Sequence, residues 1–149
     1  MRLALFQPDI AGNVGTLIRL GACLALPIDI IEPCGFAFSL RALKRSGMDY
    51  LATADVTVHA DWQAFRTARP ERLVLLTTRS NLSYPAAAFA PDDILLVGQE
   101  STGVPENVRA AAGLTVRIPL QAAMRSLNVA VAAAMVAGEA LRQTGGFAE

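Results

Sequence analysis

The chain has 149 residues, a length that fits one domain with a hydrophobic core but not two. Apolar residues make up 53% of the sequence and charged residues 17%, a composition that excludes an intrinsically disordered protein. Because 13 basic residues balance 13 acidic residues, the net charge is zero and gives no sign of a nucleic-acid partner.

The sequence carries no signal for a membrane span, for secretion or for metal binding. The longest apolar runs, 20–31 and 129–138, are shorter than the roughly 20 residues that a membrane helix needs. Only four apolar residues follow Arg2, too few for a secretory signal. Two cysteines and one histidine, His59, provide neither a disulfide framework nor a cluster of metal ligands. We therefore expect a cytoplasmic protein with no membrane span and no metal, in which His59 ends a strand.

Short, continuous apolar runs recur along the sequence and predict buried β-strands. Such runs are typical of a parallel sheet that helices cover on both faces, whereas a half-exposed sheet gives alternating polar and apolar residues. The six predicted strands are 2–6, 28–31, 56–59, 72–77, 94–97 and 115–118.

Helices are predicted in most of the intervals between these strands. Their starts are indicated by residues that cap helices or suit a first turn, such as Ser39, Asp61 and Pro105. Because strands and helices alternate with short connections, the sequence predicts a single α/β domain with a mainly parallel, six-stranded sheet. The predicted helices are 16–26, 40–46, 62–69, 105–112 and 127–142.

The last predicted helix, 127–142, has almost no polar face. Alanine, valine and methionine surround it until Glu139, so a single amphipathic stripe does not describe it. In a chain of this length we expect a second subunit to complete its cover, which gives a homodimer through the C-terminal helix. Small residues that would let another backbone approach closely are Ala130, Ala132, Ala133, Ala134, Ala137 and Gly138.

Polar residues gather after the first, fifth and sixth predicted strands. The carboxyl ends of parallel strands meet at one edge of a sheet, and open α/β sheets bind ligands at that edge. The sequence therefore predicts a site built from three loops that are far apart in the chain. Their polar and glycine residues are Asn13 and Arg19, then Gly98, Glu100 and Gly103, then Arg125, Ser126 and Asn128.

Glycine spacing argues against a dinucleotide-binding fold. The segment Gly12-Asn13-Val14-Gly15 after the first strand lacks the G-x-G-x-x-G spacing that lets a pyrophosphate reach a helix start. The sequence also has no phosphate-loop Lys-Ser/Thr motif. The later segment 98–105 has glycines near both ends; it would either wrap a ligand with backbone groups or form an ordinary turn.

Three motifs stand in order along the chain. They are Asn13-x-Gly15-x-x-x-Arg19, then Gly98-x-Glu100-x-x-Gly103-Val104-Pro105, then Ile118-Pro119 followed by Arg125-Ser126-Leu127-Asn128-Val129. With these motifs the sequence resembles the SpoU-type RNA 2'-O-methyltransferases, which belong to the SPOUT superfamily of trefoil-knotted proteins. The resemblance extends over nearly the whole chain, from 6 to 142.

Within this family the likeness is greatest to small enzymes without an added RNA-binding domain, the tRNA (cytidine/uridine-2'-O-)-methyltransferases of the wobble position. It includes the segments 30–36 and 76–78. The chain departs from the family pattern at Gly138, where members often carry an aromatic residue before the last Glu.

The resemblance implies a single SPOUT domain over 1–149 with a deep C-terminal trefoil knot. It also implies methylation of a tRNA ribose with S-adenosylmethionine as methyl donor, the anticodon stem-loop as partner, and no binding of DNA. Two alternatives stay open: methylation of another tRNA or rRNA position, and an RNA- or cofactor-binding module without catalysis.

The resemblance also implies where the cofactor binds. In these proteins adenosylmethionine lies bent in the knot and is held mostly by backbone groups. The corresponding residues of this chain are Leu76, Gly98, Ile118, Ser126 and Leu127.

The family motifs imply catalytic roles for four polar residues. Arg19 ends the first motif; because a guanidinium stays protonated, it is better suited to clamp a phosphate than to act as a base. Asn13 would hold Arg19 or the RNA backbone, or cap a helix. Glu100 would bind substrate, pair with an interface arginine or stand at a helix start. Asn128, like Ser126, would contact cofactor or ribose, or cap the last helix.

Basic residues of the predicted helix 40–46 and of the third motif are candidates for RNA phosphate contacts. The alternative is a solvated basic helix. The candidates are Arg41, Lys44, Arg45 and Arg125.

Overall fold

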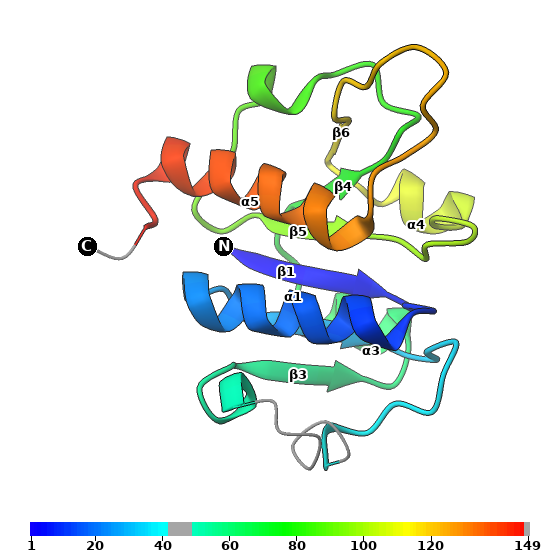
Figure 1. The fold of residues 1–149 in the computed structure, drawn as a ribbon, viewed down its shortest axis with the longest axis vertical. Coiled ribbons are helices and arrows are strands. Elements are labelled where there is room, and N and C mark those ends of the chain that lie inside the picture. Colours follow the sequence, from blue (N-terminus) through cyan, green and yellow to red (C-terminus); the bar gives the residue numbers. More distant parts are fainter. Residues whose placement is uncertain (42–48, 148–149) are drawn as a thin grey trace.

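Six short apolar segments form the strands of one all-parallel sheet in the computed structural model, which describes residues 1–41 and 49–147 (Figure 1). The strand order across the sheet is β3-β2-β1-β5-β4-β6, so the first strand lies in the middle. The strands are β1 Arg2–Phe6, β2 Ile28–Ile31, β3 Val56–His59, β4 Leu73–Leu76, β5 Ile94–Val97 and β6 Leu114–Val116.

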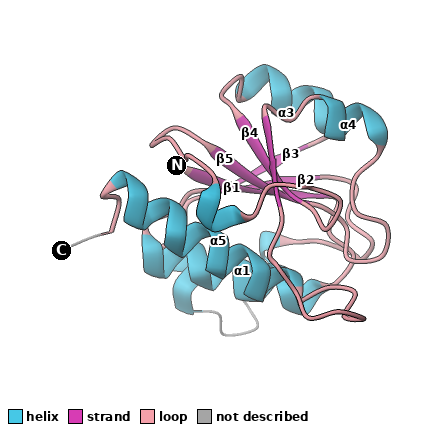
Figure 2. Ribbon diagram, turned by 90° about the horizontal axis from the view of Figure 1, so that it is seen from above, coloured by secondary structure: helices cyan, strands magenta, loops and turns pink. Residues whose placement is uncertain are grey.

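Helices cover both faces of this sheet, as the continuous apolar strands require. Figure 2 shows α1 and α5 together on one face, and α3 and α4 on the other. The α-helices are α1 Ala11–Leu24, α3 Trp62–Ala68, α4 Glu106–Ala110 and α5 Val129–Thr144, and the 3-10 helices are η1 Asp49–Ala52 and η2 Tyr84–Ala86. Within the described ranges, no helix is long and apolar enough to cross a membrane.

Alternation along each strand divides the core into two layers. Leu3 and Leu5 of β1 point toward the face that α1 and α5 cover, whereas Ala4 and Phe6 point toward the face of α3 and α4. Phe65 of α3 is completely buried in the second layer. Helices therefore bury both faces of the sheet. The ends of the strands, where polar loops begin, are the places left for a ligand site.

The start of α1 differs from the prediction. The helix begins at Ala11 rather than near residue 16, so Gly12 and Gly15 lie inside it. Val14, Leu17 and Ile18 form a buried stripe at helical spacing, and their packing against the sheet outweighs the poor helix propensity of glycine.

Helix α5 packs one side onto α1 and β5 and leaves the other side open. Its buried residues include Ala133, Val136 and Ala137, while Val131 is 49% exposed and Met135 38% exposed. Between β6 and α5 the chain follows a long loop over 117–128 (Figure 1). The threading of this loop through a knot stays a prediction.

The predicted basic helix 40–46 is described only at its first two residues. Arg41 is exposed there, and Lys44 and Arg45 lie outside the described residues. By contrast, the predicted cap of α3 is confirmed, because Asp61 accepts a hydrogen bond from the Ala64 N–H at 2.7 Å.

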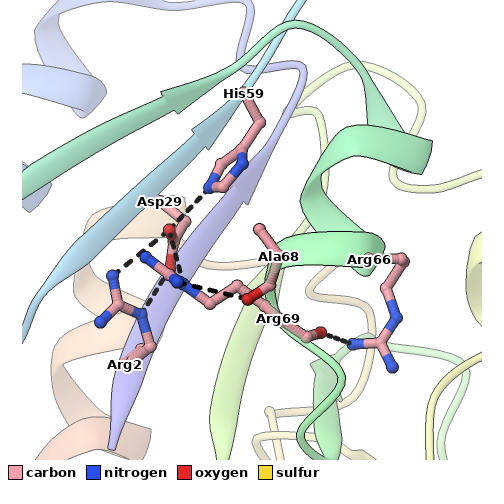
Figure 3. A network of polar contacts seen from close by, with 6 residues as sticks. All are labelled: Arg2, Asp29, His59, Arg66, Ala68 and Arg69. Carbon is pink, nitrogen blue, oxygen red and sulfur yellow. Dashed lines mark hydrogen bonds and ion pairs between the residues drawn. The ribbon is translucent and has the colours of Figure 1, made fainter.

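A buried carboxylate joins three strands of the sheet to α3 (Figure 3). Asp29 is fully buried, and it accepts from Arg2 Nε at 2.7 Å and from Arg69 Nε at 3.3 Å, with His59 Nε2 2.7 Å away. Burial by itself raises the pKa of Asp29, but hydrogen bonds from Arg2 and His59 and the charges of both arginines outweigh it and lower that pKa. His59 ends β3, as predicted, and serves this structural cluster.

Candidate functional site

The carboxyl ends of the strands open into a pocket of about 510 Å³. Loops that follow β4, β5 and β6 form its walls, and the start of α1 closes one side. Parallel strands all end at this edge, so segments far apart in sequence meet here. The predicted site residues that line the pocket are Asn13, Leu76, Gly98, Glu100, Ile118, Ser126, Leu127 and Asn128.

A chain of hydrogen bonds joins the three motif loops. Asn13 Nδ2 donates to Glu100 Oε1 at 2.8 Å, and Asn128 Nδ2 donates to Asn13 Oδ1 at 3.0 Å. Asn128 Oδ1 in turn accepts from the backbone N–H groups of Ala130 and Val131, at 2.9 and 3.3 Å, and so caps α5.

The carboxylate of Glu100 sets the direction of this series of hydrogen bonds. An ionised carboxylate only accepts hydrogen bonds, so the amide NH₂ of Asn13 must face Glu100. The amide oxygen of Asn13 then faces Asn128, whose own oxygen is left for the N–H groups of α5. Each amide has one orientation that satisfies both neighbours, so the three loops hold one another in a fixed arrangement.

A second set of contacts ties the β5 loop to the end of β1. Glu100 Oε2 accepts from the Asp9 N–H at 3.0 Å, and Asp9 Oδ1 accepts from the Glu100 N–H at 3.2 Å. Ser101 also donates to Asp9 through its hydroxyl. Burial raises the pKa of Asp9, but the hydrogen bonds from Ser101 and Glu100 outweigh burial and lower that pKa. Asp9 is therefore ionised at neutral pH.

Two glycines let the β5 loop fold back on itself. A Cβ at Gly98 would lie 2.6 Å from the Gly103 carbonyl carbon, closer than side chains tolerate. Gln99 and Gly103 exchange two backbone hydrogen bonds of 2.9 Å, and Gly103 has a φ of 74°, which favours glycine. The loop therefore presents backbone groups to the pocket.

Of the predicted site residues that the structure describes, three do not line the pocket: Arg19, Arg41 and Arg125. Arg19 is six residues after Asn13 in α1, about 9 Å along the helix axis and a third of a turn around it. All three side chains are exposed, so they are available to a large ligand outside the pocket rather than to the pocket itself.

Sequence reasoning missed two arginines that line the pocket, Arg79 and Arg109. Arg79 follows Thr77 and Thr78 directly after β4, so its place after a strand was a usable signal. Arg109 lies in the last turn of α4, four residues after the second motif, and that nearness was a usable signal.

The fold and this pocket define an α/β protein that binds a ligand where loops meet at the carboxyl ends of parallel strands. Residues 1–138 match the model of the SpoU rRNA Methylase family, and the chain belongs to this family.

Known proteins resemble the chain over most of its length. A curated relative from Beijerinckia indica, named tRNA (cytidine(34)-2'-O)-methyltransferase, is 55% identical over 150 residues, which cover 99% of this chain and 94% of the relative. A solved structure described as "Structural insights into the 2-OH methylation of C/U34 on tRNA" is 41% identical, covers 95% of this chain and 94% of that chain, and has a TM-score of 0.87.

A third likeness concerns the cofactor. An AdoMet-bound rRNA methyltransferase from Sinorhizobium meliloti is 25% identical, with a TM-score of 0.82. The match covers 95% of this chain and 55% of that chain.

Proposed function

We propose that the protein transfers the methyl group of S-adenosylmethionine to the 2'-hydroxyl of the wobble nucleotide 34 of tRNA, a cytidine or a modified uridine. The observation that carries this proposal is the meeting of all three family motifs at one pocket, joined through Glu100, Asn13 and Asn128. The names of the relatives support tRNA, and cytidine 34 in particular, as the substrate.

The pocket residues fit this cofactor. The volume of about 510 Å³ lies within the roughly 300–1,000 Å³ typical of small-molecule sites. Leu76, Ile118 and Leu127 supply apolar surface for a nucleoside base, and Gly98 lets the loop wall fold closely onto the Gly103 backbone. Ser126 adds a hydroxyl for a polar group of the ligand.

When bound, S-adenosylmethionine supplies a methyl group that its sulfonium already activates. Transfer forms the bond between the 2'-oxygen and the methyl carbon, breaks the bond between sulfur and methyl to leave S-adenosylhomocysteine, and releases the hydroxyl proton. The task left to the protein is to hold the ribose hydroxyl in line with the methyl group and to ease the loss of that proton. Arg19 is exposed and outside the pocket, so it is suited to grip the RNA phosphate next to the target ribose with its planar fork of N–H groups. Arg41 and Arg125 are proposed to contact phosphates further along the anticodon stem-loop.

The proposed homodimer forms through α5. Val131 and Met135 are four residues apart and therefore on the same side of the helix, and both are exposed in a single chain. Leu127, 40% exposed, and Met124, 64% exposed, extend this apolar surface toward the pocket. A second copy that covers it would bring the two pockets close to the shared interface.

The test of the function is methyl transfer to defined tRNA. Purified protein, labelled S-adenosylmethionine and bulk tRNA should give nuclease-resistant 2'-O-methylated dinucleotides, with ribosomal RNA as the comparison substrate. A tRNA assembled with 2'-deoxycytidine at position 34 should accept no methyl, while the matched tRNA with 2'-deoxycytidine at position 32 should accept it. Methylation of bases alone, or equal labelling of both tRNAs, contradicts the proposal.

The role of Arg19 is tested separately. Arg19→Ala should abolish turnover and leave the calorimetric affinity for S-adenosylmethionine unchanged, because Arg19 lies outside the pocket. Arg142→Ala is the matched control, since Arg142 is an exposed arginine paired with Glu139 at the far end of α5. Loss of cofactor binding in Arg19→Ala would show that Arg19 is structural.

A further inference from the structure

Arg19 lies against an aromatic ring. Its Cζ is 4.6 Å from the centroid of the Tyr50 ring, a distance at which a cation is attracted to the ring face. Among the side chains that the structure describes, 1–41, 50 and 52–147, no carboxylate pairs with Arg19. Among these described side chains, the ring of Tyr50 is thus the partner of the Arg19 guanidinium, through a cation–π contact.

Tyr50 is held in place by its own backbone. It lies in η1, which packs against α1, and its carbonyl oxygen accepts from the Ala54 N–H at 2.8 Å. The same oxygen accepts from the Thr53 N–H at 3.2 Å and from the Thr53 hydroxyl at 3.1 Å. The ring therefore belongs to an anchored turn, and Tyr50 as a whole residue is 37% exposed.

A ring and a carboxylate hold an arginine in different ways. A carboxylate uses the N–H donors in the guanidinium plane and cancels its charge. A ring attracts the cation to its face and carries no negative charge, so the positive charge is not cancelled and no carboxylate occupies the N–H donors that a phosphate would use. The contact with Tyr50 thus restrains Arg19 while it leaves the guanidinium charge available to a phosphate.

We propose that Tyr50 is a positioning residue that presents Arg19 to the substrate phosphate through this cation–π contact. The proposal rests on the proposed function, in which Arg19 grips the RNA backbone. The aromatic ring of Tyr50, and not its hydroxyl, makes this contact, because the measured distance is to the ring centroid and a cation–π contact needs no hydroxyl.

Two substitutions separate the ring from the hydroxyl. Tyr50→Leu should lower kcat/KM for tRNA about two- to fivefold, the range for an exposed cation–π contact. Tyr50→Phe keeps the ring and should retain the kcat/KM of the unmodified protein. The calorimetric affinity for S-adenosylmethionine should stay the same in both variants, and the unfolding temperature should fall by no more than about 2–4 °C in Tyr50→Leu. An unchanged kcat/KM in Tyr50→Leu, or an equal loss in Tyr50→Phe, overturns the proposal.

A spectroscopic measurement tests the contact without activity. The Hε resonance of Arg19 should be shifted upfield by the ring in the unmodified protein and in Tyr50→Phe, and should lose that shift in Tyr50→Leu. If the unmodified protein transfers no methyl to tRNA, the proposed function fails while this resonance still reports on the contact. If the protein is active but the resonance is the same in all three proteins, the positioning role fails.

Discussion

Replacing Asn128 with alanine removes three hydrogen bonds from the start of α5. Asn128 Oδ1 accepts from Ala130 N–H at 2.9 Å and Val131 N–H at 3.3 Å, and Nδ2 donates to Asn13 Oδ1 at 3.0 Å. Loss of a helix N-cap costs about 1 kcal/mol, and loss of one side-chain hydrogen bond costs about 1 kcal/mol more. We therefore expect Asn128→Ala to lower the free energy of unfolding by about 2 kcal/mol.

Asp61→Ala is the matched control for the cap alone. Asp61 caps α3 with one bond of 2.7 Å to the Ala64 N–H and does not line the pocket. Urea unfolding should show a loss of about 1 kcal/mol for this variant. In calorimetry, Asn128→Ala should bind S-adenosylmethionine about fivefold more weakly, equivalent to about 1 kcal/mol, and Asp61→Ala should bind it normally. Equal losses of stability together with equal cofactor affinities would refute the coupling of α5 to the motif loops.

Three further changes test other parts of the structure. Asp29→Asn should lower the free energy of unfolding by about 3 kcal/mol at neutral pH, because it leaves a buried charge cluster incomplete. The pKa of Asp29 in the folded protein lies below its ordinary 3.8, so the ionised carboxylate stabilises the fold above about pH 4. The difference in unfolding free energy between the two proteins should therefore become smaller as the pH falls below about 4. Gly98→Ala should lower stability by about 1–3 kcal/mol in urea unfolding and weaken cofactor binding, because its Cβ meets the Gly103 backbone, whereas Gly12→Ala, in open space, should do neither. Met135→Glu should give a monomer in sedimentation, and a dimer that persists contradicts the α5 interface.

The strands and the edge that carries the site could be predicted because both follow from local composition. Continuous apolar runs such as 94–97 have one structural solution in a covered parallel sheet, and the loops after them must share an edge. The start of α1 could not be predicted in this way. Whether Gly12 and Gly15 break a helix depends on how Val14 packs against the rest of the fold, and the local sequence does not predict that packing.

The contacts inside the site could not be predicted from the sequence, for a different reason. Glu100 and Asn13 are 87 residues apart, and Asn13 and Asn128 are 115 residues apart, so no spacing rule relates them. The family motifs grouped these residues, but the direction of the hydrogen-bond chain needed coordinates. The contact of Arg19 with Tyr50 was missed similarly, because nothing local distinguishes that tyrosine from an ordinary turn residue.

The place of β1 in the middle of the sheet has a consequence for synthesis on the ribosome. β1 is translated first, yet one of its neighbours, β5, is translated some ninety residues later, and residues 126–129 complete the last wall of the pocket later still. A nascent chain shorter than this lacks the Asn128 link and the wall that residues 126–129 supply, so a truncated product cannot form the complete pocket at the ends of the strands.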